Sequence, residues 1–221
     1  MHGELEVVED VAAAFVTHFR AAHASRPGPF FSVALSGGET ARRCYERLAE
    51  EARDLDWMTV DLYWGDERCV PPTDPASNQR LAREALMERT GGFHAWYPMS
   101  CDEGPDAYQL RLSSIEALDL VHLGLGADAH TASLFPDSRA LTADPGRWVA
   151  LNDDPSGRND FKRMTLTPHG IARARHVVVT VSGEQKKDAL DRVRRGDPTA
   201  PGTLVRGDDV TWLADRAAAG G

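Results

Sequence analysis

The sequence predicts an α/β fold built on a mostly parallel, twisted sheet with helices on both faces. Short apolar runs, typical of buried strands, alternate along the chain with segments in which apolar residues recur at helical spacing. The loops between them are short, as they are in doubly wound sheets. No segment has the composition of a linker, so residues 1–221 are expected to form a single domain.

The first half of the chain predicts a helix and then two strands, each followed by a further helix. Residues 5–24 have helical periodicity and run into a Pro-Gly-Pro stretch, so a helix is expected to precede the first strand. That strand is expected at Phe30–Leu35, with a helix after it to about residue 52. The same order recurs as a strand at 59–64 and a helix that Ser77 caps and Gly91-Gly92 ends.

The second half contains further strand-like segments. We expect them at Leu120–Leu123, 147–151, 163–167, His176–Val181 and Val210–Leu213. Helices are expected from Pro105 to about Leu118, from Pro168, and from a capping box at Ser182–Gln185 to about Arg195. The tail, residues 216–221, is expected to fray.

The composition excludes several classes of protein. The net charge of −9, without a basic stripe, argues against a nucleic-acid partner. The acidic N-terminus and the lack of a long apolar stretch support neither export nor a membrane partner. Cys44, Cys69 and Cys101 are too few and too irregularly spaced for a disulfide framework, so we expect free thiols in a reducing cytoplasm. A monomer is expected separately.

Ligands of such sheets bind beyond the carboxyl ends of the strands, where four polar loops are expected. In the first, Ser36-Gly37-Gly38 brings bare backbone N–H groups to the start of a helix, which suits a phosphate. A simple tight turn explains the glycines equally well, and Glu39 is an unfavourable neighbour for a phosphate.

The second loop contains Asp66-Glu67-Arg68 and continues to Ser77-Asn78. Three adjacent charges are more often a solvated turn than a site. At the end of a strand, however, an arginine can bind a phosphate or carboxylate while the carboxylates orient it or contact sugar hydroxyls.

The third loop, residues 123–136, contains Gly124-x-Gly126, which imitates a dinucleotide fingerprint. We reject that interpretation because Phe135-Pro136 breaks the helix that the fingerprint requires. His130 lies two residues beyond Asp128 and is suited to act as a base whose tautomer the carboxylate sets. A lone histidine is more often structural, but the Gly-rich strand end favours a site.

The fourth loop combines Arg163 with Lys186. Lys186 shares a helical face with apolar residues and should point inward, whereas Lys187 should point away. A cation in a first helical turn opposes the helix dipole, and a bound anion would relieve the conflict. The alternative is a lysine that extends to solvent at the rim.

Together these segments resemble the 6-phosphogluconolactonases. The family patterns are Leu-Ser-Gly-Gly-Ser-Thr-Pro, Asp-Glu-Arg-x-Val-Pro with a later Ser-Asn, Gly-x-Asp-Gly-His-Thr-Ala-Ser-Leu-Phe-Pro, Arg-x-Thr-Leu-Thr and Gly-x-x-Lys. The matching segments, in order, are Leu35–Thr40, Asp66–Pro71, Ser77-Asn78, Gly126–Pro136, Arg163–Thr167 and Gly183–Lys186. Six matches in order over most of the chain are highly specific.

Four positions depart from the family patterns. Glu39 and Ala41 replace Ser and Pro in the first loop. Ala129 replaces the Gly before the histidine, at a cost of about 1 kcal/mol if the position requires a positive φ. Asp137 replaces a frequent Gly after the Pro.

The resemblance implies a Rossmann-like, three-layer α/β/α fold of the glucosamine-6-phosphate deaminase type. It also implies hydrolysis of 6-phospho-D-glucono-1,5-lactone to 6-phosphogluconate, the second step of the oxidative pentose phosphate pathway, without metal or nucleotide. His130 would then activate water, with Asp128 orienting the imidazole. The expected phosphate and oxyanion partners are Ser36, Gly37, Gly38, Arg68, Arg163 and Lys186, and Asp66 and Asn78 are expected to shape the loop or meet sugar hydroxyls.

Three other functions compete with this one. A Ser-His-Asp hydrolase would use Ser36 or Ser133, but neither lies in a Gly-x-Ser-x-Gly elbow. Glucosamine-6-phosphate deaminases share the Gly-x-Asp-Gly-His loop but carry an acidic residue a few positions later, which residues 131–135 lack. A non-catalytic sugar-phosphate sensor usually adds a DNA-binding segment, and only about 30 residues precede the first expected strand.

Overall fold

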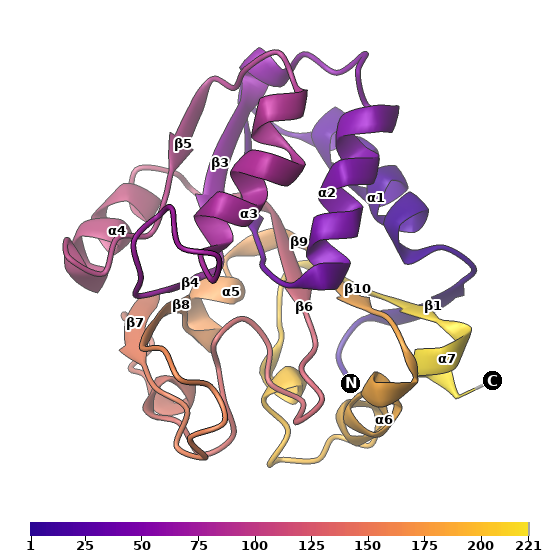
Figure 1. Ribbon diagram of the computed structural model, residues 1–221, viewed down its shortest axis with the longest axis vertical. Coiled ribbons are helices and arrows are strands. Elements are labelled where there is room, and N and C mark those ends of the chain that lie inside the picture. Colours follow the sequence, from indigo (N-terminus) through magenta and orange to yellow (C-terminus); the bar gives the residue numbers. More distant parts are fainter. Residues whose placement is uncertain (221) are drawn as a thin grey trace.

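The computed structural model describes residues 1–220, and a seven-stranded sheet runs through the centre of the protein (Figure 1). Every neighbouring pair in this sheet is parallel, and the order is β1-β10-β9-β6-β2-β3-β5. The strands are β1 (Glu4–Val8), β2 (Phe31–Leu35), β3 (Val60–Trp64), β5 (Ala95–Tyr97), β6 (Leu118–Gly124), β9 (Ala174–Val181) and β10 (Asp209–Asp215). The predicted parallel α/β architecture is confirmed.

Helices cover the sheet, and α1, α2 and α3 stand side by side in the upper part of Figure 1. The helices are α1 (Val11–Ser25), α2 (Glu39–Glu51), α3 (Asn78–Ala85), α4 (Gly104–Leu112), α5 (Pro168–Ile171), α6 (Lys187–Arg194) and α7 (Arg216–Ala219). The third and fourth are shorter than predicted because their C-terminal stretches turn into 3₁₀ or irregular backbone. Within residues 1–220, no helix has the length and apolar character needed to cross a bilayer.

A second, antiparallel sheet lies beside the first. It consists of β4 (Asp66–Arg68), β7 (Val149–Asn152) and β8 (Arg163–Leu166), in the order β4-β8-β7. Gly65 connects the sheets, because its N–H donates to Leu35 O and its carbonyl accepts from Leu166 N–H. The sequence did not predict β4, since a three-residue charged strand has no apolar pattern.

The N-terminal helix prediction is wrong in its first turn. Residues 4–8 form the edge strand β1, paired with β10, and the helix begins only after Asp10. The Asp10 carboxylate accepts from Ala12 N–H and Ala13 N–H and so starts α1. Val8 fits the helical spacing but belongs to β1. Three residues therefore precede the first strand, and not the expected 30 or so.

The C-terminal predictions need two corrections. Ser182 does not form a capping box: its hydroxyl donates to Asp215, a single 3₁₀ turn covers Glu184–Lys186, and α6 follows. The tail is helical from Arg216 to Ala219, because Asp215 caps α7 through Ala218 N–H and Ala218 is buried. Gly221 lies outside the described residues.

The expectation of three free thiols is also wrong. Cys69 and Cys101 form a disulfide, with Cα atoms 5.4 Å apart, whereas Cys44 is free and buried. The sequence could not indicate this pairing, because 32 positions separate the two cysteines and only the fold brings β4 close to the loop before α4.

A buried histidine links the strands beneath the first loop. His122 on β6 is fully buried, with Nδ1 2.9 Å from the Tyr45 hydroxyl and Nε2 2.9 Å from Thr180 Oγ1. The Tyr45 hydroxyl also accepts from Ser36 N–H at 2.7 Å. The ends of β2, β6 and β9 are therefore connected through α2.

We expect the disulfide to stabilise the oxidised protein by about 3–4 kcal/mol, because it closes a loop of this length in the unfolded chain. Urea unfolding of the parent with and without a dithiol reductant measures the difference. The double variant Cys69→Ser/Cys101→Ser is the control and should not respond to the reductant. Equal unfolding midpoints for oxidised and reduced parent would contradict the assignment.

We also expect an acid-sensitive contribution from His122, because burial lowers its pKa from 6.5 to about 3. The unfolded chain takes up this proton below pH 6.5 and the folded protein does not. The free energy of unfolding should therefore fall as the pH drops from 6.5 toward 3, by up to about 1.4 kcal/mol per pH unit. His122→Asn should remove this part of the slope, and urea titrations at pH 7, 6 and 5 compare the two proteins.

Candidate active site

A cavity of about 360 Å³ opens where β2, β6 and β9 end. Eight of the ten residues predicted for the site line it: Ser36, Gly37, Gly38, Asp66, Arg68, Asn78, His130 and Lys186. The other two, Asp128 and Arg163, are not among the lining residues. Asp128 contacts His130, and Arg163 is paired with Arg68 across β4 and β8. The fold thus brings together four loops that are up to 150 residues apart in the sequence.

The first loop presents backbone N–H groups to the cavity. Gly38 precedes α2 with a φ of 91°, and no side chain caps that helix, so its first N–H groups remain open beside the cavity. Gly37 is required for another reason: a Cβ there would lie 1.8 Å from Asn78 Oδ1. The loop is shaped to hold an anion.

Buried carboxylates hold the second loop. Glu67 accepts from the N–H groups of Arg68, Asn78 and Gln79 and from the Ser77 hydroxyl, and so fastens β4 to the start of α3. Burial raises the pKa of Glu67, and these hydrogen bonds oppose that effect. Glu67 was expected only as one of the carboxylates that orient Arg68 or meet sugar hydroxyls. Its capping role has no local sequence signal, because a carboxylate that caps a neighbouring helix looks like any other surface charge.

Asp66 connects the second loop to the third. Its carboxylate accepts from Ser133 Oγ at 2.6 Å and from Asn78 Nδ2 at 3.2 Å. Asp66 and Asn78 are both buried, as a role in shaping the loop requires. Ser133 points to Asp66 rather than to His130, so it is not arranged as a nucleophile next to a base.

His130 lies in the cavity wall with a carboxylate behind it. The imidazole Nδ1 is 2.5 Å from Asp128 Oδ1, and the backbone N–H of His130 donates to the same oxygen at 3.2 Å. An ionised carboxylate only accepts, so in the neutral imidazole Nδ1 carries the proton and Nε2 keeps its lone pair. Burial opposes ionisation of Asp128, but its hydrogen bonds with His130 prevail and lower the pKa of Asp128 from 3.8 to about 2.

The backbone of this loop is unusual. Ala129, Ala132 and Asp137 all have a positive φ, at 69°, 47° and 60°. Two of the departures noted in the sequence, Ala129 and Asp137, therefore occupy conformations that favour glycine. A Cβ at Gly126 would lie 2.1 Å from His130 Nδ1, so this position must be glycine for the imidazole to reach Asp128.

Two arginines meet between β4 and β8, where Arg68 and Arg163 are paired residues. Arg68 lines the cavity and donates to Ala76 O, whereas Arg163 is buried behind it against the rings of Phe135 and Phe161. Arg68 Nε and Arg163 Nε and Nη1 are buried without a partner among the described residues. Burial and the charge of Arg68 lower the pKa of Arg163. Such a pair attracts an anion.

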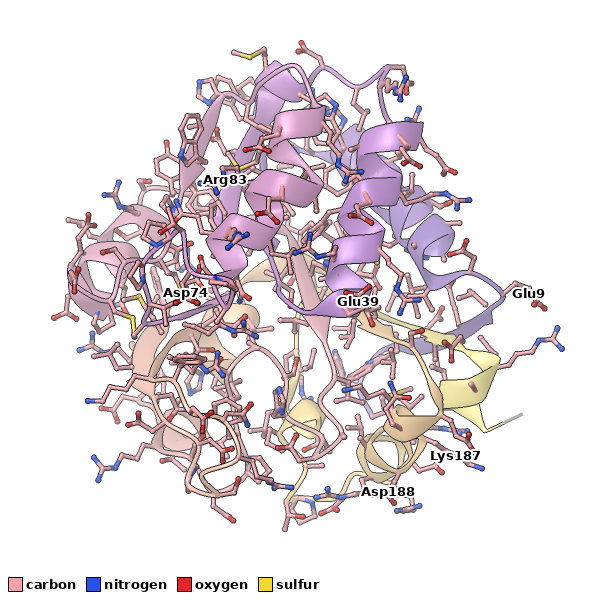
Figure 2. The ribbon with its side chains drawn as sticks, viewed as in Figure 1. Glu9, Glu39, Asp74, Arg83, Lys187 and Asp188 are labelled. Carbon is pink, nitrogen blue, oxygen red and sulfur yellow. A yellow bond between two sulfur atoms is a disulfide. The ribbon has the colours of Figure 1, made fainter. Side chains whose placement is uncertain are left out.

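Lys186 lines the cavity and Lys187 is exposed, as predicted, although Lys186 belongs to the 3₁₀ turn rather than to α6. Figure 2 shows Lys187 and Asp188 at the outside of α6. Burial lowers the pKa of Lys186, and the charge of Asp128 opposes that shift.

The cavity also contains residues that the sequence analysis did not assign to the site. Arg43 and Thr180 are among its lining residues. An inward-facing threonine at the end of a buried strand, and an arginine one turn into the helix after a Gly-Gly loop, are signals that could have indicated them.

A family model described as "Glucosamine-6-phosphate isomerases/6-phosphogluconolactonase" matches residues 3–212. The chain belongs to this family. The 6-phosphogluconolactonase of Synechocystis sp. is 36% identical over 205 residues, which cover 85% of this chain and 82% of that protein.

Solved structures give the same result. The 6-phosphogluconolactonase from Trypanosoma brucei superimposes with a TM-score of 0.87 at 28% identity, covering 99% of this chain and 98% of that one. The enzyme from Leishmania guyanensis gives 0.86 at 27% identity, covering 100% and 99%. A monomeric glucosamine-6-phosphate deaminase gives 0.82 at 17% identity, which shows the shared fold alone.

The resemblance implies that His130 is a base, and on that expectation Gly126→Ala should displace its ring from Asp128 and lower kcat by at least about tenfold, because a displacement of 1 Å in a catalytic group costs up to about 10²-fold. Steady-state turnover of 6-phospho-D-glucono-1,5-lactone, the substrate that the resemblance implies, measures kcat. Gly146→Ala is the matched control, since a Cβ there meets nothing within 4 Å. If the two variants turn over equally fast, the close approach at Gly126 has no functional weight.

Proposed function

We propose that this protein is a 6-phosphogluconolactonase that hydrolyses 6-phospho-D-glucono-1,5-lactone to 6-phosphogluconate in the oxidative pentose phosphate pathway. One observation carries the proposal: the His130–Asp128 pair lies in the wall of a cavity that also contains Arg68, Lys186 and an uncapped helix N-terminus. A base and an anion site in one cavity suit an ester with a phosphate. The curated relatives named above support the same activity.

In the proposed mechanism, His130 Nε2 removes a proton from a water molecule as its oxygen attacks the lactone carbonyl carbon. The carbonyl becomes a tetrahedral oxyanion, and Asp128 stabilises the imidazolium through Nδ1–H. When the intermediate collapses, the bond to the ring oxygen breaks and Nε2–H returns its proton to that oxygen. The products are the hydroxyl and the carboxylic acid, which ionises in water.

The cations divide into two groups in this proposal. Arg68 supplies its guanidinium at one wall, with the charge of the buried Arg163 behind it, and Lys186 supplies its ammonium from another element. Gly37, Gly38 and Ser36 add polar groups of the first loop, while Asp66 and Asn78 face the sugar from the second. Each group of donors can take either the phosphate or the developing oxyanion.

The proposal extends to the setting of the enzyme. It acts as a monomeric, single-domain protein in the cytoplasm. The Cys69–Cys101 bond removes the free-thiol argument for that compartment, where thiol reductants would oppose the bond. Size-exclusion chromatography with light scattering tests the monomer, and a mass of twice 24.2 kDa would exclude it.

We expect His130→Ala to reduce catalysed hydrolysis by about 10²–10⁴-fold, because positioned proton transfer contributes that much. Asp128→Asn should lose a similar factor, since an amide can present its N–H to Nδ1 and leave the proton on Nε2. Initial formation of 6-phosphogluconate above spontaneous hydrolysis measures both effects.

His2→Ala, at the exposed N-terminal end, is the control and should keep the parent rate. Equal rates for the parent and His130→Ala would exclude the mechanism. Release of ammonia from glucosamine 6-phosphate by the parent would favour the deaminase reaction instead.

A further inference from the structure

Two charged residues at the cavity rim, Glu39 and Arg43, have no part in the mechanism above. Both line the cavity and both belong to α2, one helical turn apart. Figure 2 places Glu39 at the lower end of that helix, where the first loop enters it. Their side chains are 73% and 57% exposed, so they can move when a ligand arrives.

Glu39 conflicts with the proposed anion site. Its carboxylate stands in the first turn of α2, directly after the Gly37-Gly38 backbone that would bind a phosphate. A phosphate bound to that backbone would bring a second negative charge close to the Glu39 carboxylate, and the two charges would repel each other. A cation beside Glu39 would reduce this repulsion when the phosphate is bound.

Arg43 is the group in position to do so, and it is only loosely held. Its Nε lies 3.8 Å from Glu39 Oε1, which is an ion pair but too long for a hydrogen bond. Its guanidinium donates no hydrogen bond to any of residues 1–220. Exposed pairs of this kind are weak, so a dianion can compete for the guanidinium.

The other side of Arg43 is acidic. A neighbouring hollow of about 480 Å³ shares Arg43 with the cavity and is also lined by Glu46, Glu50 and Asp215. Arg43 is thus the cation at the boundary between an acidic hollow and the cavity that contains Arg68 and Lys186.

We infer that the Arg43 guanidinium moves away from the Glu39 carboxylate and binds the phosphate of the substrate directly. This inference rests on the proposed function. The fork of the guanidinium matches two phosphate oxygens, and its charge offsets the carboxylate that stands in place of the usual serine of the first loop. Arg43 is a binding residue that acts on KM, since nothing places it at the carbonyl.

The first test compares Arg43→Gln with Arg47→Gln. Arg47 lies one turn further along α2, pairs with Glu51 and does not line the cavity. Arg43→Gln should raise KM and the Kd of inorganic phosphate about tenfold and leave kcat within twofold. Arg47→Gln should leave all three within twofold. A change of less than twofold for Arg43→Gln overturns the inference.

A second test separates contact with phosphate from mere neutralisation of Glu39. Glu39→Ser removes the carboxylate and should tighten phosphate binding. If Arg43 contacts the phosphate, Arg43→Gln still weakens binding about tenfold in the Glu39→Ser background. If Arg43 only neutralises Glu39, the loss disappears in that background, and the inference is wrong.

Titration calorimetry with inorganic phosphate keeps this result independent of catalysis. A parent protein that binds phosphate but hydrolyses no lactone would contradict the proposed function. The same titration would still decide whether Arg43→Gln weakens phosphate binding. If the parent hydrolyses the lactone and Arg43→Gln binds phosphate as tightly as the parent, the inference about Arg43 is wrong and the proposed function stands. A parent that binds no phosphate at millimolar concentration would also overturn it.

Discussion

The site depends on two adjacent buried carboxylates, Asp66 and Glu67. Successive side chains of a β-strand point to opposite faces, so the carboxylates of these two neighbours reach different partners. Glu67 accepts four hydrogen bonds that fasten β4 to the start of α3, and Asp66 reaches across to Ser133 in the histidine loop. Burying two charges is costly unless donors surround them, and here the donors are the loops themselves. The same contacts that pay for burial therefore set the geometry of the cavity.

The histidine loop adds a second constraint. Three residues other than glycine adopt a positive φ between residues 129 and 137, a concentration of backbone strain next to the proposed base. The loop is held by Thr131, whose hydroxyl donates to Gly124 O, and by Ser133. Close packing of Gly126 against the imidazole completes it. Ala129 shows that a family pattern which favours glycine can be met by alanine when the surrounding contacts hold the conformation.

Three cations, Arg43, Arg68 and Lys186, line the cavity of a chain whose net charge is −9. Burial lowers the pKa of both Arg163 and Lys186, which means that each cation is destabilised where it stands. Several guanidinium nitrogens of Arg68 and Arg163 lack partners among the described residues. An anionic ligand in the cavity would offset these positive charges at short range, whereas salt screens the field of the whole protein beyond about 8 Å.

The sequence by itself determined the parallel α/β architecture and eight residues of the cavity lining. The architecture follows from local patterns, because apolar runs mark buried strands and glycines mark strand ends. The eight residues lie in loops that these patterns mark, and their assignment to the site also rests on the resemblance to the 6-phosphogluconolactonases. The sequence alone could not reveal β4, the Cys69–Cys101 disulfide or the capping role of Glu67. Nor could it place the strand at Glu4–Val8, whose pairing with β10 joins the two ends of the chain. Each of these depends on segments that are distant in sequence and meet only in the folded protein, so tertiary structure decided them.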